Sequence, residues 1–569
     1  MARSFLPFRY RILLPLTIVF LVLTGKVLAA SPPTPFVPGP YAVGCSNVAQ
    51  DFSRIGSGET ANDYWEGVPA GTRGRYVTDL LSDPANALVA NTPVPDDREL
   101  FSGHAAQTLP FAILVCYPTS PDNPRPAYAL PDGRTVPHMQ QGAQPPIWPD
   151  ATTRWPMLVF SHGLTGSPLT SDYLEALTEF ASFGYVVVAP FHGDLRFADI
   201  KIQDLSDAVY AALHFSSFIE LQAMRPLSDS AAISYVLAHP SFAPRLDSDK
   251  IGVFGASLGG EGALLAVGAR LTTTVGQSSK QVLFDPRIKA VVGYVPYFGN
   301  VLPAFGRDQK GLDGVTVPFM AISGTADTTA PLPYVIQGMG RLTGSRELVT
   351  LQGVPHAFDY ASANDIFTWS VTFLAAHAQD DRLARATLAR MMQVPGGGDD
   401  RVLIDYTAPA ALAPGERDVV EFYNASLDHY FITAEPAEAA MLDAGIIVPG
   451  WARTGFAFKA YAQDAGPGVP TCRFFGTPGV GPNSHFYTID ARECARVRSD
   501  PHWQFEGLAF AEEPAAGGLC PANRVPVTRL YNNGMGGQAS HRFITSHSES
   551  VAMVASGWLV EGPVFCAPP

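Results

Sequence analysis

The chain has 569 residues, of which 47% are hydrophobic and only 16% are charged, so its composition excludes a disordered protein. A formal net charge of −14 makes nucleic acids and anionic membrane surfaces unfavourable partners, because both are bound by clustered Lys and Arg. The length allows about two to four domains.

Residues 1–29 have the pattern of a signal peptide. Arg3, Arg9 and Arg11 make a basic beginning, and the apolar stretch Ile12–Leu23 follows them. That stretch is short of the roughly 20 residues that cross a bilayer, and no long apolar run occurs later in the chain. We therefore expect a cleaved signal peptide and a secreted or periplasmic protein without a membrane span.

Export fits the cysteines, which are six in number. An even count in an oxidising compartment predicts disulfides, and the absence of a C-x-x-C pair gives no support to a zinc or redox site. The four C-terminal cysteines allow three pairings. The pairs that we favour are Cys45–Cys116, Cys472–Cys494 and Cys520–Cys566.

Residues 30–390 are predicted to form one α/β domain with an N-terminal extension. From about residue 109 onward, continuous apolar segments alternate with helical patterns, which indicates a mostly parallel sheet covered on both faces. The strands are expected at residues 110–117, 156–161, 185–190, 250–255, 288–295, 318–323 and 347–352. The helices are expected at residues 169–183, 227–238, 259–269 and 366–378.

Residues 255–259, GASLG, form a G-x-S-x-G motif centred on Ser257. The pentapeptide alone is weak and could be a glycine-rich turn. Here it directly follows an apolar strand and opens an Ala/Leu-rich helix, which is the setting of a nucleophile elbow. Ser257 is therefore the predicted nucleophile.

A serine nucleophile needs a base and an acid. His356 follows the last predicted strand, and Asp327 follows the strand before it. The order Ser257, Asp327, His356 is the chain order of α/β-hydrolase triads. Asp194, which follows an earlier strand, is the alternative acid.

An oxyanion hole requires backbone N–H groups beside the nucleophile. Leu258 follows Ser257, and Leu164 lies in the loop HGLTG that follows an earlier strand. These two residues are the predicted donors, whereas His162 is interpreted as a packing residue. No metal or nucleotide motif accompanies them, so no cofactor is expected.

The motifs FSHGLTGS, GASLGG, GTADTTAP and PHAF, in that order, resemble those of secreted serine α/β-hydrolases. Similar families are the platelet-activating-factor acetylhydrolase-like esterases, the dienelactone-hydrolase-like esterases and the cutinase-like polyester hydrolases. The resemblance covers roughly residues 109–380 and implies an α/β-hydrolase fold and a metal-free Ser-His-Asp esterase. Dienelactone hydrolase itself uses a cysteine, whereas this chain has Ser257.

Residues 391–418 are predicted to be a linker, and residues 419–569 a module of three repeats. Three sequence blocks recur in the same order, and their histidines His429, His485 and His541 are evenly spaced. Each repeat predicts strand, strand, short helix and strand, giving a three-repeat α+β module that resembles an uncharacterised bacterial repeat module.

The repeated aromatic residues of the module suggest binding of an extended glycan or polymer, but regularly spaced aromatic residues in a repeat are more often its shared core. They are Tyr430, Tyr487, Phe543, Trp451, Trp503 and Trp558.

For the whole chain, the sequence favours a secreted hydrolase of small or polymeric carboxylic esters. The alternatives are a peptidase of the same fold and a non-enzymatic surface or polymer-binding protein that retains a relic triad.

Overall fold

The computed structural model describes residues 36–46, 81, 87–130, 133–140, 144–170, 172–198, 213–300, 303–357, 360–409, 411–446 and 448–569. The predicted signal peptide, residues 1–29, lies outside the described residues. Among the helices that are described, none is both long and apolar enough to cross a membrane.

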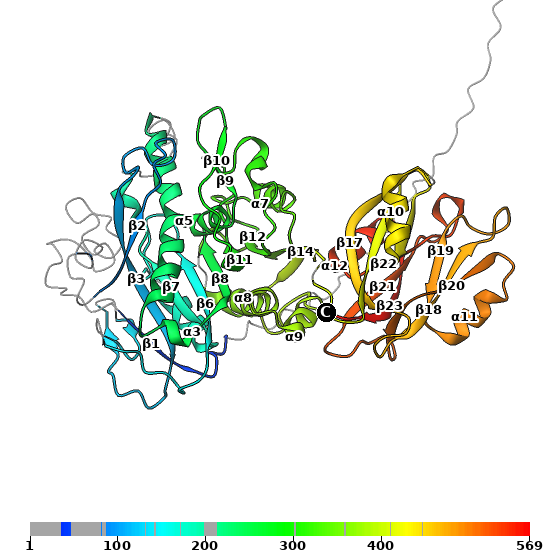
Figure 1. Ribbon diagram of the computed structural model, residues 1–569, viewed down its shortest axis with the longest axis horizontal. Coiled ribbons are helices and arrows are strands. Elements are labelled where there is room, and N and C mark those ends of the chain that lie inside the picture. Colours follow the sequence, from blue (N-terminus) through cyan, green and yellow to red (C-terminus); the bar gives the residue numbers. More distant parts are fainter. Residues whose placement is uncertain are drawn as a thin grey trace, which may run out of the picture. The chain divides into compact units, whose positions relative to one another are not determined.

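A ten-stranded sheet organises the N-terminal domain, in the order β1-β3-β7-β6-β8-β11-β12-β13-β14 with β2 paired to β3 (Figure 1). The neighbours from β7 to β13 are parallel, and the outer pairs are antiparallel. The strands are β1 Ala42–Cys45, β2 Leu88–Pro93, β3 Thr108–Thr119, β6 Trp155–Ser161, β7 Val186–Pro190, β8 Leu246–Ala256, β11 Ile288–Tyr294, β12 Phe319–Gly324, β13 Arg346–Leu351 and β14 Asp400–Tyr406. Two small hairpins consist of β4 Tyr128–Ala129 with β5 Thr135–Val136, and β9 Arg270–Thr272 with β10 Ser279–Gln281.

Helices cover both faces of this sheet. Successive strand residues point to opposite faces, so that Val253 and Phe254 of β8 belong to two separate hydrophobic clusters. The cluster of Val253 includes side chains of α5, α6 and α7, and the cluster of Phe254 includes side chains of α3 and α8. The helices are α3 Tyr173–Ser182, α5 Phe215–Ala238, α6 Leu258–Ala266, α7 Leu332–Met339, α8 Ala363–Ala378 and α9 Arg382–Leu388. The predicted mixed α/β fold with a mostly parallel central sheet is confirmed.

The segment expected to be a linker, residues 391–418, is not one throughout. Asp400–Tyr406 forms β14, which pairs antiparallel with β13 and ends the sheet. The Asp405 carboxylate then accepts hydrogen bonds from Ser546 Oγ at 2.6 Å and from the backbone N–H of His547 at 2.6 Å, at the start of α12. A carboxylate at a helix N-terminus satisfies amides that have no intrahelical acceptor, so this segment joins the sheet to the C-terminal module through defined contacts.

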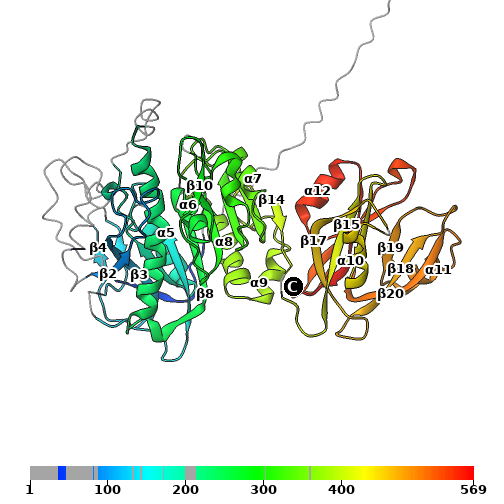
Figure 2. The same ribbon diagram turned by 45° about the horizontal axis from the view of Figure 1, so that its top comes forward.

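The C-terminal module repeats one order of elements three times: strand, strand, helix, strand. The helix of each repeat, α10, α11 and α12, is labelled in Figure 2. Its strands form a nine-stranded sheet in the order β16-β15-β17-β20-β23-β21-β22, with β18 paired to β19 and β20. The first segment has β15 Glu416–Asn424, β16 His429–Thr433, α10 Pro436–Ala444 and β17 Trp451–Tyr461. The second has β18 Val469–Gly476, β19 His485–Thr488, α11 Ala491–Arg498 and β20 Trp503–Pro514. The third has β21 Val525–Tyr531, β22 His541–Ile544, α12 His547–Ala555 and β23 Leu559–Ala567.

The aromatic residues that suggested ligand binding mostly pack inside this module. Tyr487, Phe543 and Trp558 are buried, and Trp451 and Trp503 are half-buried. Their rings contact other aromatic rings of the module, as in the edge contact between Tyr487 and Phe543 at a centroid distance of 5.5 Å. The burial favours the shared-core interpretation over an exposed aromatic binding face.

The three predicted disulfides are confirmed, with the pairing that the sequence favoured. Cys45–Cys116 joins the paired strands β1 and β3, where the two residues are direct neighbours in the antiparallel register. In the C-terminal module, Cys472–Cys494 joins β18 to α11 within the second segment, and Cys520–Cys566 joins the loop before β21 to β23.

Candidate active site

Ser257 lies at a sharp turn between β8 and α6. Its φ of 53° and ψ of −117° place a non-glycine residue in a rare backbone conformation. Flanking glycines make the turn feasible, because a Cβ on Gly259 would lie 1.9 Å from Ser161 O and one on Gly255 would lie 2.3 Å from Gly259 O. This is the geometry of the predicted nucleophile elbow.

The structure brings the three predicted triad side chains together. Ser257 Oγ lies 2.8 Å from His356 Nε2, and His356 Nδ1 lies 2.7 Å from Asp327 Oδ2. Asp327 follows β12, and His356 follows the neighbouring strand β13, so adjacent parallel strands bring these two side chains to the same sheet edge. The chain therefore contains a serine that can pass its proton to an imidazole oriented by a carboxylate.

Asp327 is held by a second set of hydrogen bonds. Its side chain has no exposed surface, and its Oδ1 accepts the backbone N–H groups of Thr329 at 2.9 Å and Ala330 at 2.8 Å. These donors leave Oδ2 directed at His356. The loop of His356 is fixed in turn by Tyr294, whose hydroxyl donates to Ala357 O at 2.7 Å.

The segments that carry the two predicted oxyanion donors lie next to Ser257. Leu258 is the first residue of α6, where a backbone N–H has no intrahelical acceptor. Leu164 follows Gly163, and a Cβ placed on Gly163 would lie 3.6 Å from Ser257 Cβ. The loop carrying Leu164 is therefore packed directly against the nucleophile.

Asp194, the alternative acid, is hydrogen-bonded to the loop of Leu164 and not to His356. Its Oδ2 accepts the backbone N–H of Thr165 at 2.8 Å, and its two oxygens accept Arg225 Nε and Nη2 at 3.0 and 2.5 Å. None of these bonds reaches His356. Sequence reasoning missed Arg225, because its burial, which is unusual for an arginine, is seen only in the structure.

Two buried histidines, His162 and His192, contact each other beside the loop of Leu164. Burial and the nearby Arg225 lower the pKa of His162 to about 4, so this imidazole is neutral at neutral pH. It interacts with Gly163 O at 2.8 Å and accepts the backbone N–H of His192 at 3.2 Å. These contacts fit the packing role that the sequence indicated for His162.

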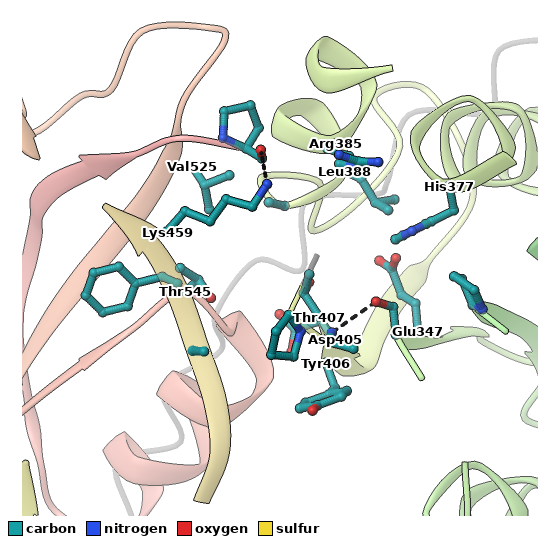
Figure 3. Close-up of a pocket in the computed structure, with 18 of the residues that line it drawn as sticks. Glu347, His377, Arg385, Leu388, Asp405, Tyr406, Thr407, Lys459, Val525 and Thr545 are labelled. Atoms are coloured by element: carbon teal, nitrogen blue, oxygen red, sulfur yellow. Dashed lines mark hydrogen bonds between the residues drawn. The ribbon is translucent and has the colours of Figure 1, made fainter. Parts of the chain in front are cut away.

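A cavity of about 320 Å³ lies elsewhere in the molecule (Figure 3). Glu347 of β13, His377 of α8 and Lys459 of β17 are among its lining residues, and burial, together with Asp405, raises the pKa of Glu347 well above its usual value. None of Ser257, Asp327 and His356 lines it. Since catalysis requires convergent reactive groups, the triad and not this cavity marks the candidate active site.

Comparison with known proteins supports an esterase-type hydrolase. Residues 140–223 match the family "Platelet-activating factor acetylhydrolase, isoform II", which covers the loop of Leu164 but not the triad positions. Residues 403–513 and 481–568 match a domain of unknown function (DUF5648).

The chain is also similar to a bis(hydroxyethyl) terephthalate hydrolase of Streptomyces coelicolor. The two are 23% identical over 232 residues, which is 39% of this chain and 66% of that relative, just under two thirds of its length. Fold, family match and relative together support an ester hydrolase with an α/β-hydrolase-like domain and a β-rich C-terminal module.

Proposed function

We propose that the protein is a secreted serine hydrolase that cleaves carboxylic esters through an acyl-enzyme intermediate. The observation that carries the proposal is the continuous chain of contacts from Ser257 Oγ to His356 Nε2 and from His356 Nδ1 to Asp327. Proton transfer along such a chain needs hydrogen-bond distances, and both contacts meet that requirement.

In the proposed reaction, Ser257 Oγ attacks the ester carbonyl carbon while its proton moves to His356 Nε2. The carbonyl oxygen becomes an oxyanion that accepts the N–H groups of Leu258 and Leu164. The intermediate collapses and the C–O bond breaks, with His356 donating its proton to the departing alcohol. Water, deprotonated by His356, then attacks the acyl-enzyme to form a second intermediate. The bond between the acyl carbon and Ser257 Oγ breaks, His356 returns its proton to Ser257 Oγ, and the acid is released.

Export is part of the proposal. The sequence of residues 1–29 predicts a signal peptide, and the three disulfides are typical of proteins that fold in an oxidising compartment. Signal cleavage is tested by sequencing the N-terminus of the protein recovered from the periplasm or the medium.

A fluorophosphonate probe tests the mechanism, because it labels only an activated serine. We expect labelling of the intact protein and loss of labelling in Ser257→Ala, whereas Ser278→Ala, a change at an exposed hairpin serine, should be labelled normally. A folded protein that neither takes the label nor hydrolyses p-nitrophenyl esters would refute the proposal and favour the relic-triad alternative.

The substrate class is tested with a panel. It should contain p-nitrophenyl esters of graded acyl length, bis(hydroxyethyl) terephthalate, a solid polyester and peptide p-nitroanilides. The relative of known activity motivates the terephthalate ester. Cleavage of the anilides at rates comparable with the esters would favour the peptidase alternative.

A further inference from the structure

Arg225 of α5 is hydrogen-bonded to the loop that carries the proposed oxyanion donor. Its Nη1 donates to His162 O at 2.6 Å, and its Nη2 donates to Gly163 O at 2.9 Å. The side chain is 1% exposed, so these bonds form in a region of low dielectric. A single guanidinium thus holds two successive carbonyl groups of this loop.

These carbonyls determine where the neighbouring N–H groups point. In a trans peptide the C=O of one residue and the N–H of the next point in opposite directions, and no described peptide bond is cis. Because Gly163 O faces Arg225, the Leu164 N–H must face away from Arg225. The preceding peptide follows the same rule, since the Gly163 N–H donates in another direction, to Tyr173 Oη at 3.3 Å.

Asp194 fixes the other side of Leu164. Its Oδ2 accepts the Thr165 N–H at 2.8 Å, and Thr165 has a φ of 58°, a left-handed conformation that is unfavourable for a β-branched residue. Asp194 also neutralises Arg225 through its contacts with Nε and Nη2, which the burial of both side chains requires.

We propose that Arg225 and Asp194 are positioning residues that orient the Leu164 N–H as an oxyanion donor. The inference rests on the proposed function, because only a reaction with an oxyanion needs that donor. A free loop containing Gly163 could turn this peptide over, which would present a carbonyl oxygen to the developing negative charge. The ion pair prevents that rotation without touching the substrate.

Arg225→Lys and Asp194→Asn test this role. Lysine lacks the planar fork that reaches two carbonyls and a carboxylate together, and asparagine removes the charge that holds the guanidinium. Each should lower kcat at least about 10-fold, toward the roughly 100- to 1,000-fold that loss of an oxyanion donor costs, with KM nearly unchanged. Because the two residues act as a unit, the double variant should be little worse than either single variant.

A second readout separates positioning from general damage. A trifluoromethyl ketone forms an oxyanion on Ser257, so its affinity should fall in proportion to kcat/KM, whereas the affinity of a matching ether analogue, which forms no oxyanion, should not change. Arg287→Lys is the matched control, because Arg287 makes a comparable two-bonded pair with the buried Asp285 beside the amino end of β11. It should leave kcat and ketone affinity unchanged.

The inference is overturned if a folded Arg225→Lys or Asp194→Asn variant keeps kcat and ketone affinity within about twofold of the wild type. It is also overturned if Arg287→Lys lowers both as much. If Arg225→Lys does not fold, Asp194→Asn alone decides, since it keeps an oxygen acceptor for Thr165. Wild-type protein that shows no labelling and no ester hydrolysis would instead refute the proposed function itself.

Discussion

Glu421 and Arg542, from the first and third segments of the C-terminal module, form a buried ion pair. Arg542 donates from Nε to Glu421 Oε2 at 2.9 Å and from Nη2 to Oε1 at 3.0 Å, and both side chains are 3% exposed. Arg542 also donates to Glu549 of α12 at 3.0 Å. This pair closes the junction between the last segment and the first.

At the other two junctions the arginine lies on the first strand of the later segment, where the third junction has Glu421. At the first, Arg473 of β18 pairs with Glu438 of the preceding segment and Glu506 of its own, and lies over the ring of Phe431. At the second, Arg529 of β21 repeats this pattern with the residues Glu493, Glu561 and Phe486.

Strand pairing shows that the third junction has its arginine and its glutamate at exchanged positions. In the first two hairpins a phenylalanine, Phe431 or Phe486, pairs with Phe422 or Phe474. At the equivalent position of the third hairpin, Arg542 pairs with Leu530. Glu421 occupies the place of the two arginines, and Thr454, which donates to Glu421 Oε1 at 2.8 Å, occupies the place of Glu506 and Glu561. The third junction thus differs from the other two at three positions, Glu421, Thr454 and Arg542, and the three residues there bind one another.

Arg542→Phe alone should destabilise the module by about 3–5 kcal/mol, because it leaves Glu421 buried without its partner. The triple variant Glu421→Arg, Thr454→Glu, Arg542→Phe should recover most of that loss, since it rebuilds the arrangement of the other two junctions. Calorimetric unfolding of the full chain measures both. Asp443→Asn, in the exposed pair with Arg453, is the control and should change little, and a triple variant no more stable than Arg542→Phe would contradict the equivalence.

The elbow of Ser257 should not tolerate Gly259→Ala. The added Cβ would lie 1.9 Å from Ser161 O and 2.9 Å from His162 O, both backbone atoms that cannot move without shifting β6. We expect little soluble protein and no fluorophosphonate labelling. Gly276→Ala is the control, because its nearest neighbour would be Thr274 Oγ1 at 3.6 Å, and it should retain normal yield and activity.

Asp327→Asn should lower kcat by about 10³- to 10⁴-fold. An amide presents its NH₂ either to His356 Nδ1, which then loses its acceptor, or to the donors Thr329 N–H and Ala330 N–H. The melting temperature and the rate of p-nitrophenyl ester hydrolysis check this together. Near-normal hydrolysis by the variant would show that Asp327 is not the acid of the reaction.

The proximity of Ser257, Asp327 and His356 could be predicted because each has a local signal. Ser257 directly follows an apolar strand, Asp327 and His356 lie in the loops after two others, and parallel strands bring their carboxyl ends to one edge. Arg225 could not be predicted, because its partners Gly163 and Asp194 are distant in sequence and meet it only through the packing of α5.

β14 was missed for a different reason. Asp400–Tyr406 is a short edge strand in which most side chains are only partly buried, and a glycine run precedes it. A strand with one neighbour and few buried positions lacks the continuous apolar pattern that identified the central strands. Its place in the sheet depends on pairing with β13, a tertiary contact that local sequence does not encode.

Glu261 of α6 is buried, and its Oε1 accepts a hydrogen bond from Gln222 Nε2 at 2.5 Å. This residue should make the stability of the folded protein depend on pH. Burial raises its pKa from 4.5 to about 8. Between about pH 5 and pH 8 the unfolded chain releases this proton while the folded chain retains it, so the group lowers stability as pH rises, by up to about 1.4 kcal/mol per pH unit.

Glu261→Gln removes that dependence and keeps an oxygen acceptor for Gln222. Relative to the wild type, the variant should therefore gain stability as the pH is raised from 5 to 8. Asp229→Asn should act in the same direction, because burial raises the pKa of Asp229 to about 7. Melting temperatures of both variants and the wild type at pH 5 and pH 8 measure the effect. A difference from the wild type that is the same at the two pH values would show that Glu261 does not hold its proton in the folded protein.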